Sequence, residues 1–210
     1  MKTDALILDV DGTLWDTTGL VKDSWMLAAA DEGVNVTITA DDLKKYFGKP
    51  MDEIARLVFP EQSEERRSAI MKRGERYEEE VLETCEEDLS YPGVADTIRE
   101  LSERIDICVV SNCQSGYIEL ACKKIGISKF IRDHECFGDH GLYKAENIRL
   151  VAERNGYKHP VYLGDIQGDA DASHEAGVRF IHAAYGFGKV KEADAVINSF
   201  SELKELLENE

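Results

Sequence analysis

The stretch LILDVDGTLWDT, residues 6–17, sets the interpretation of the whole sequence. Its apolar beginning predicts a short buried strand, and Asp9 and Asp11 follow two positions apart, with Asp16 shortly after. Carboxylates at the end of a buried strand repel one another and lose hydration, which costs free energy. The stretch is therefore either a turn that happens to be acidic or a site that needs concentrated negative charge.

The composition is typical of a soluble globular protein. The chain has 210 residues, of which 43% are hydrophobic and 32% charged, enough for one core or for a core domain with a smaller insert. The formal net charge of -17 argues against general binding to nucleic acids or anionic membranes, because both are polyanions. The sequence has neither an apolar run long enough to cross a bilayer nor the layout of a signal peptide at its beginning.

The cysteines and histidines form no recognisable metal or disulfide pattern. The five cysteines are scattered without a CxxC pair, which is typical of neither a disulfide framework nor a zinc site. The five histidines are also scattered, without an HExxH pair. The simplest interpretation is a set of reduced thiols in a cytoplasmic protein.

Strand and helix patterns alternate through the second half of the chain. Such alternation predicts a parallel sheet with right-handed crossovers. The expected strands cover residues 105–110, 160–164, 178–183 and 195–197. The expected helices cover residues 94–103, 115–125, 145–155 and 168–176, with a last one from about residue 199.

Helical patterns dominate residues 18–88, where strand signals are sparse. Thr39 and Ser63 are predicted to cap two helices, and we interpret the charge-rich faces of the long helix after Ser63 as solvated surface. The sequence therefore predicts an α/β fold. A Rossmann-like parallel-sheet core, residues 1–17 and 89–210, would carry an all-helical insertion after its first strand.

Polar side chains follow three of the predicted strands. Asp9 and Asp11 follow the first, Ser111 and Asn112 end the strand at 105–110, and Asp165 ends PVYLG. In open parallel sheets, ligands bind beyond the carboxyl ends of the strands, where the strand order reverses. We therefore expect these side chains to meet at one functional site.

The residue types at these positions suit a phosphate together with a divalent cation. Magnesium takes oxygen ligands, usually one or two carboxylates with waters and phosphate oxygens, and the aspartates could hold it. A serine hydroxyl, backbone N–H groups and Lys144, 21 residues before Asp165, could bind the remaining phosphate oxygens. Carboxylates alone would repel a phosphate, so the cation and the lysine make the site consistent.

These segments resemble the four motifs of the haloacid dehalogenase superfamily, in their usual order. The matching segments are DVDGTLWDT, the strand-end Ser111-Asn112, Lys144 and GDIQGD. They span nearly the whole chain. A helical insert directly after the first motif resembles the phosphoglycolate phosphatase-like branch, in which residues 18–88 would form a helical cap domain.

The resemblance implies a role for each acidic residue and for the lysine. Asp9 matches the nucleophile that forms an aspartyl-phosphate, and Asp11 matches the general acid/base, whose backbone carbonyl binds magnesium. Lys144 matches the lysine that neutralises charge on nucleophile and phosphate. Asp165 matches a magnesium-binding carboxylate, and Asp169 a second one that binds directly or through water.

The resemblance also implies a set of residues that bind the phosphate. Ser111 matches the hydroxyl that binds the transferring phosphoryl group, with Asn112 beside it. Gly12 and Thr13 match the turn that supplies backbone N–H groups to the phosphate. In the insertion, Lys49 is a candidate for contact with the substrate.

The implied activity is a magnesium-dependent phosphatase acting on a small, phosphoglycolate-like phosphate monoester. A dehalogenase is the first alternative, but dehalogenases of this type need no acid/base partner at Asp11. A phosphomutase would require cap groups that keep water from the phosphoenzyme and hold a sugar. A non-enzymatic scaffold that binds a partner would be favoured by the loss of a motif, and all four are intact. GFGK, residues 186–189, lacks the spacing of a phosphate-binding loop and receives no role.

Overall fold

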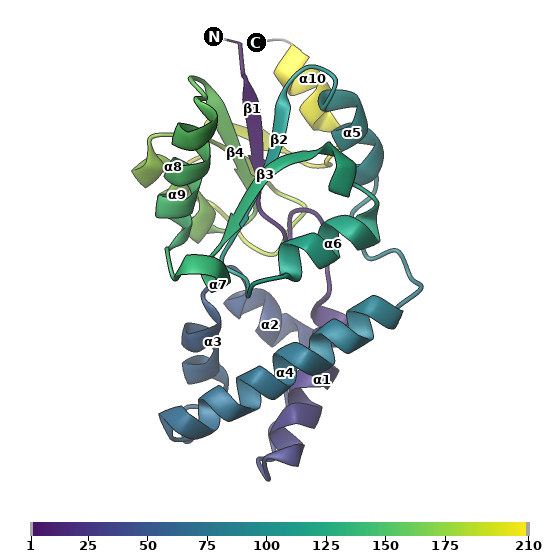
Figure 1. Ribbon diagram of the computed structural model, residues 1–210, viewed down its shortest axis with the longest axis vertical. Helices are drawn as coiled ribbons and strands as arrows, with labels where there is room; N and C mark the ends of the chain where they lie inside the picture. Colours follow the sequence, from purple (N-terminus) through teal and green to yellow (C-terminus); the bar gives the residue numbers. More distant parts are fainter. Residues whose placement is uncertain (1, 209–210) are drawn as a thin grey trace.

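A six-stranded parallel sheet forms the centre of the structure, a computed structural model that describes residues 2–208 (Figure 1). The strand order is β3-β2-β1-β4-β5-β6. The strands are β1 (Ala5–Leu8), β2 (Asp106–Ser111), β3 (Ile131–Cys136), β4 (Pro160–Gly164), β5 (Arg179–Ala183) and β6 (Ala195–Ile197). The chain order reverses on either side of β1, so the carboxyl ends of β1, β2 and β4 lie side by side.

Helices cover both faces of this sheet, because side chains of a strand alternate between the faces. Leu6 and Leu8 pack in one cluster with α5 (Val94–Leu101), α6 (Tyr117–Ile125) and α10 (Glu202–Glu208). Ile7 packs in another with α8 (Lys144–Asn155) and α9 (Gln167–Ala176). The short helices η1 (Ser128–Phe130) and α7 (Phe137–His140) flank β3. The expected α/β fold is confirmed.

Four helices between β1 and α5 lie together beyond the carboxyl ends of the strands (Figure 1). They are α1 (Thr18–Asp31), α2 (Ala40–Tyr46), α3 (Met51–Val58) and α4 (Glu64–Thr84), and they share a hydrophobic cluster of their own. The Thr39 hydroxyl accepts the Asp42 N–H at 3.1 Å, and the Ser63 hydroxyl accepts the Arg66 N–H at 3.3 Å, which confirms both predicted caps.

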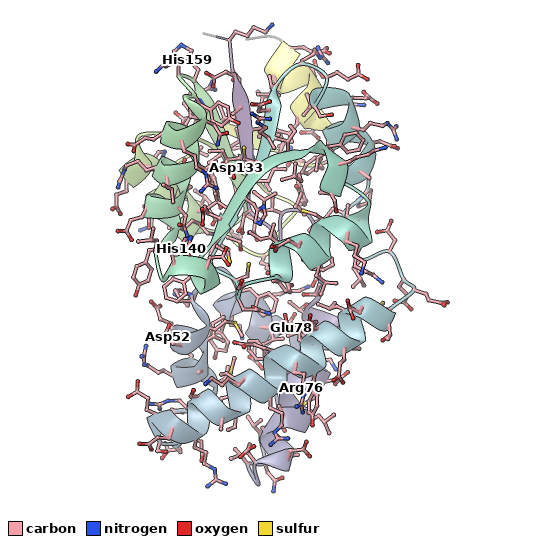
Figure 2. All side chains as sticks on the ribbon, viewed as in Figure 1. Asp52, Arg76, Glu78, Asp133, His140 and His159 are labelled. Carbon is pink, nitrogen blue, oxygen red and sulfur yellow. The ribbon has the colours of Figure 1, made fainter. Side chains whose placement is uncertain are left out.

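The edge strand β3 was not expected from the sequence. Its residues IRDHEC place four consecutive polar or charged side chains between Ile131 and Cys136, instead of forming an apolar run. Arg154 of α8 pairs with Asp133 at 2.5 Å and also binds Glu135, so the charges of β3 are compensated from another element (Figure 2 labels Asp133). The compensating residue lies 21 positions from Asp133, outside the reach of a local pattern.

The interpretation of the charge-rich faces of α4 as solvated is wrong at one residue. Glu78 is only 3% exposed, because the side of α4 that carries it packs toward α1 and the core. Its neighbours Glu79 and Glu80 are exposed, as expected. Figure 2 shows Glu78 at the edge of α4 nearest the core.

Two expectations from composition can be compared with the described residues. All five cysteines are free thiols, in agreement with the absence of a disulfide framework. Among residues 2–208, no helix has both the length and the apolar character needed to span a bilayer.

Candidate active site

The ends of three neighbouring strands bring together the first set of candidate residues. Asp9 follows β1, Ser111 ends β2 and Asp165 follows β4, and each side chain is almost completely buried. The Asp9 N–H donates to the Leu163 carbonyl at 2.9 Å, which continues the pairing of β1 with β4 and fixes where the Asp9 carboxylate lies.

Lys144 joins two of the aspartates. It is the first residue of α8, and its Nζ donates to Asp9 Oδ1 at 2.9 Å and to Asp169 Oδ1 at 2.5 Å. Burial lowers the pKa of Lys144, but Asp169 and Asp9 outweigh that effect and hold the pKa well above its usual range. The ammonium group therefore stays charged beside the candidate nucleophile.

Both carboxylate oxygens of Asp169 accept hydrogen bonds within the site. Oδ1 binds Lys144, and Oδ2 accepts the backbone N–H groups of Asp165 at 2.9 Å and Ile166 at 3.0 Å. These bonds fix the start of α9 and the position of Lys144. Asp169 is thus placed to orient the site as well as to add negative charge to it.

The three buried aspartates form a cluster with uncompensated negative charge. Oxygens of Asp9, Asp165 and Asp169 lie within 4.8 Å of one another, and Lys144 contacts Asp9 and Asp169. Three negative charges and one positive charge leave a formal charge of -2. Burial raises the pKa of Asp9 to about 6 and, with repulsion from Asp169, raises that of Asp165 well above its usual range. A divalent cation with oxygen ligands fits this charge and these donors.

Asp11 has a different environment from Asp9. Its Oδ1 accepts hydrogen bonds from Tyr117 Oη at 2.8 Å, Trp15 Nε1 at 3.2 Å and Thr17 Oγ1 at 3.4 Å. Burial raises the pKa of Asp11 to about 7, although the bonds from Tyr117 and Trp15 lower it. Because Oδ1 accepts from three donors, Oδ2 is the oxygen left to carry a proton. A carboxyl group of this kind can give and take a proton near neutral pH.

The loop GFGK supports Asp165, a role that the sequence analysis missed. The Phe187 N–H donates to Asp165 Oδ2 at 2.6 Å. A Cβ atom at Gly186 would lie 2.3 Å from both Asp165 Cβ and the Gly12 carbonyl oxygen, so only glycine fits there. The available signal was a pair of glycines closely following the last long strand.

The turn at Gly12 and Thr13 differs from the expectation. The Gly12 N–H donates to the Trp15 carbonyl at 2.9 Å, and the Thr13 N–H donates to the Val10 carbonyl at 3.2 Å. The turn itself uses both groups, so we do not assign them to a phosphate. Gly12 is required for another reason: its φ is +77°, and a Cβ there would lie 2.2 Å from Asp165 Oδ2.

Asn112 and Lys49 lie where the strand ends meet the helical insertion. Asn112 Nδ2 donates to the Gly48 carbonyl at 2.8 Å, which ties the end of β2 to the turn between α2 and α3. Lys49 follows in that turn and is exposed. Both residues line the same small cavity, together with Asp11 and Ser111.

This cavity lies between the catalytic candidates and the insertion. Its volume is about 30 Å³, and Trp25, Phe47 and Glu78 line it from the insertion side. A neighbouring cavity of about 400 Å³ shares part of the same lining at Cys113 and Gln114. The smaller cavity has room for no more than a water molecule or two.

The fold and site define a parallel α/β protein with a buried acidic centre at its strand ends, beneath an inserted group of helices. The model of the haloacid dehalogenase-like hydrolase family matches residues 6–183, and the chain belongs to this family.

Known proteins resemble the chain over nearly its whole length. It is 22% identical over 190 residues to pyrophosphatase PpaX from Oceanobacillus iheyensis, covering 88% of this chain and 85% of that protein. The crystal structure of a predicted phosphoglycolate phosphatase from Haemophilus somnus 129pt has a TM-score of 0.88 at 18% identity, covering 98% of each chain. CbbY from Rhodobacter sphaeroides, in complex with phosphate, has a TM-score of 0.82 at 22% identity, covering 96% of each chain. The two structural similarities establish the fold.

Proposed function

We propose that the protein is a magnesium-dependent phosphatase that hydrolyses a small phosphate monoester, comparable in size to phosphoglycolate, through an aspartyl-phosphate on Asp9. One observation carries the proposal: Lys144 contacts Asp9 and Asp169 inside a buried acidic cluster of formal charge -2. Such a cluster suits a divalent cation and a phosphate held together. The names of two similar proteins, a pyrophosphatase and a predicted phosphoglycolate phosphatase, agree with chemistry at phosphorus.

Asp9, Asp165 and the backbone carbonyl of Asp11 would hold the magnesium ion. Lys144 takes Oδ1 of Asp9, and the Phe187 N–H takes Oδ2 of Asp165, so the other oxygen of each carboxylate remains for the ion. When bound, magnesium offsets the negative charge of the phosphate and of the aspartates around it.

The chain's own residues account for the proton and the bond changes. An Asp9 oxygen attacks phosphorus, and the bond from phosphorus to the alcohol oxygen breaks while Asp11 Oδ2 gives that oxygen its proton. Asp11 then takes a proton from a water that attacks phosphorus, the bond from phosphorus to the Asp9 oxygen breaks, and inorganic phosphate leaves. The Ser111 hydroxyl donates a hydrogen bond to a phosphoryl oxygen. Lys144 offsets the negative charge of Asp9 and of the phosphate.

We also propose that residues 18–88 form a cap that opens to admit the substrate and closes to exclude water. The support is the cavity of about 30 Å³, which is too small for a phosphate ester while α1–α4 stay in place. If this segment is exchanged for that of a relative, substrate preference should follow the cap. Preference that stays with the core would contradict this role.

The test of the proposed function is phosphate release from a panel of monoesters with magnesium, including p-nitrophenyl phosphate, with a 2-haloacid as the substrate of a dehalogenase. Asp9→Ala should abolish release, and the wild-type protein should form a hydroxylamine-labile acyl-phosphate during turnover. Asp171→Asn is the control, because Asp171 is exposed and lies two residues beyond Asp169. Normal release from Asp9→Ala would end the proposal.

A further inference from the structure

We infer that Glu78 and Asn112 recognise a hydrogen-bond donor on the alcohol part of the substrate, so that esters of small amino alcohols and diols are preferred over esters of hydroxy acids. This specificity presupposes the proposed function, because it concerns the group that leaves when phosphorus is attacked. The two residues belong to different parts of the fold, α4 and the end of β2.

Glu78 is a buried acid whose hydrogen bonds present it as an acceptor. Trp25 Nε1 donates to its Oε2 at 3.0 Å, and Gln114 Nε2 donates to its Oε1 at 3.4 Å. These bonds hold the carboxyl group at the cavity. Both printed partners of this carboxyl group are neutral, and burial raises its pKa to about 8, opposed by Trp25 and assisted by Asp11.

Such a group is costly if it serves packing alone. An uncompensated buried carboxylate destabilises the fold, and an amide or an apolar side chain would fill the same place at a lower cost. Buried acids with perturbed pKa values gather at functional sites for this reason. A donor on a ligand, above all an ammonium group, would supply the missing compensation.

Asn112 presents a second acceptor to the same cavity. Its Nδ2 donates to the Gly48 carbonyl at 2.8 Å, and this bond fixes the amide orientation. Oδ1 is buried and, within residues 2–208, has no hydrogen-bond partner. Buried polar atoms are normally paired, so an orphaned acceptor beside a catalytic candidate points to a donor that arrives with the ligand.

The rest of the cavity lining favours a short carbon chain that ends in this donor. Trp25, Phe47 and Ile54 supply apolar surface, while Asp11 lies where the leaving oxygen is protonated. The basic residue in this lining is Lys49, which is exposed to solvent and therefore screened. A carboxylate on the substrate would bring no hydrogen-bond donor to Asn112 Oδ1 or Glu78, and burying its charge beside two acidic groups would cost desolvation without compensation.

Four esters of matched size separate the chemistries: phosphoethanolamine, 2-hydroxyethyl phosphate, propyl phosphate and phosphoglycolate. They end in an ammonium, a hydroxyl, a methyl and a carboxylate group respectively. With magnesium, kcat/KM of the wild-type enzyme should be highest for the ammonium ester and next for the hydroxyl ester. Both should exceed propyl phosphate by about tenfold or more, because a site built to bond a donor rejects the analogue that lacks it. Phosphoglycolate should be the poorest substrate of the four.

Glu78→Gln should lower kcat/KM for phosphoethanolamine by about ten- to a hundredfold, the range for a hydrogen bond to a charged group. For propyl phosphate, which offers no hydrogen-bond donor, kcat/KM should change by less than about threefold. Glu80→Gln, which removes the same charge from an exposed position on the same helix, should leave the order of the four substrates unchanged.

The outcomes separate this specificity from the proposed function. The inferred specificity is wrong if kcat/KM of the wild-type enzyme is equal for phosphoglycolate and phosphoethanolamine, or if Glu78→Gln lowers kcat/KM for all four esters equally. Neither result contradicts the proposed phosphatase activity. If neither these esters nor p-nitrophenyl phosphate is cleaved, the proposed function falls and the specificity with it. If Glu78→Gln does not fold, the order of the wild-type kcat/KM values for the four esters still tests the specificity.

Discussion

Asp9 and Asp11 are two residues apart, yet their surroundings suit different tasks. Lys144 binds Asp9 at 2.9 Å and favours its charged form, whereas Asp11 accepts from the neutral donors Tyr117, Trp15 and Thr17. Two carboxyl groups whose environments differ in this way can act as nucleophile and proton donor at one pH. In the proposed reaction, they therefore do not exchange roles.

Asp11→Asn keeps the shape of the side chain and removes its proton. Turnover of an alkyl phosphate should fall by about 10²–10⁴-fold, the usual contribution of general acid/base catalysis. The fall in the phosphorylation rate should be smaller for p-nitrophenyl phosphate, because nitrophenolate leaves without a proton. Single-turnover measurement of phosphoenzyme formation checks this, and an equal fall for both leaving groups would show that Asp11 is not the acid.

Glu78 should make the stability of the protein depend on pH. Burial raises its pKa from 4.5 to about 8 in the folded chain, with Asp11 and Glu75 raising it further and bonds from Trp25 and Gln114 lowering it. A raised folded-state pKa means that the native state binds the proton more tightly than the unfolded state. The stabilisation is therefore complete below pH 4.5 and is lost as the pH rises toward 8.

Glu78→Gln removes this titration. Its free energy of unfolding, relative to that of the wild-type protein, should rise between pH 5 and 8 by about 1 kcal/mol per pH unit. Denaturant unfolding at several pH values measures the difference. For Glu80→Gln, this difference in the free energy of unfolding should not change with pH. A difference that is also constant with pH for Glu78→Gln would contradict the raised pKa of Glu78.

At the scale of elements, the acidic site depends on loops that approach one another closely. The turn after β1 and the loop after β5 both pack on Asp165, and a glycine in each allows the approach. The Phe187 N–H fixes one Asp165 oxygen at 2.6 Å. Groups that orient a metal ligand contribute to metal affinity without touching the metal.

Gly186→Ala tests this packing. Its Cβ would lie 2.3 Å from Asp165 Cβ, so the loop or Asp165 must shift. The magnesium concentration for half-maximal activity should rise by about 10–100-fold, the usual effect of removing an outer support. Gly19→Ala is the matched control, because nothing lies within 4 Å of a Cβ at that position of α1. An unchanged magnesium requirement in Gly186→Ala would show that the loop does not support the site.

For the whole molecule, the charge balance links ion binding to stability. The chain has a formal net charge of -17, and its buried acidic cluster adds repulsion that the fold must bear. An ion that binds the folded state alone stabilises it by mass action. Magnesium should therefore stabilise the protein as well as activate it.

Thermal unfolding in excess chelator and in magnesium measures this stabilisation. Magnesium at about a hundred times its Kd should stabilise the folded state by about 2.7 kcal/mol and raise Tm by several degrees. Asp165→Asn should abolish most of this increase in Tm with magnesium. Sodium chloride at matched ionic strength controls for screening of the surface charge, and an equal rise in Tm with that salt would contradict a specific site.

The sequence by itself determined the parallel sheet and its flanking helices, because buried parallel strands are apolar runs and helix caps are local. It also predicted that Asp9, Ser111 and Asp165 meet, because the carboxyl ends of parallel strands lie at one edge of a sheet. Lys144 was identified by its position 21 residues before Asp165 and by the resemblance to the family's motifs, and the structure places it as the first residue of α8.

Tertiary structure decided what depends on contacts between distant segments. The Tyr117 bond to Asp11 joins residues 106 positions apart, and no local pattern marks it. The charged strand β3 is stable because Arg154 compensates it from α8. Glu78 looks like its exposed neighbours in sequence, and only the packing of α4 against Trp25 and the core buries it. Periodicity identifies the faces of a single element, but the partner that covers each face is set by how the elements pack.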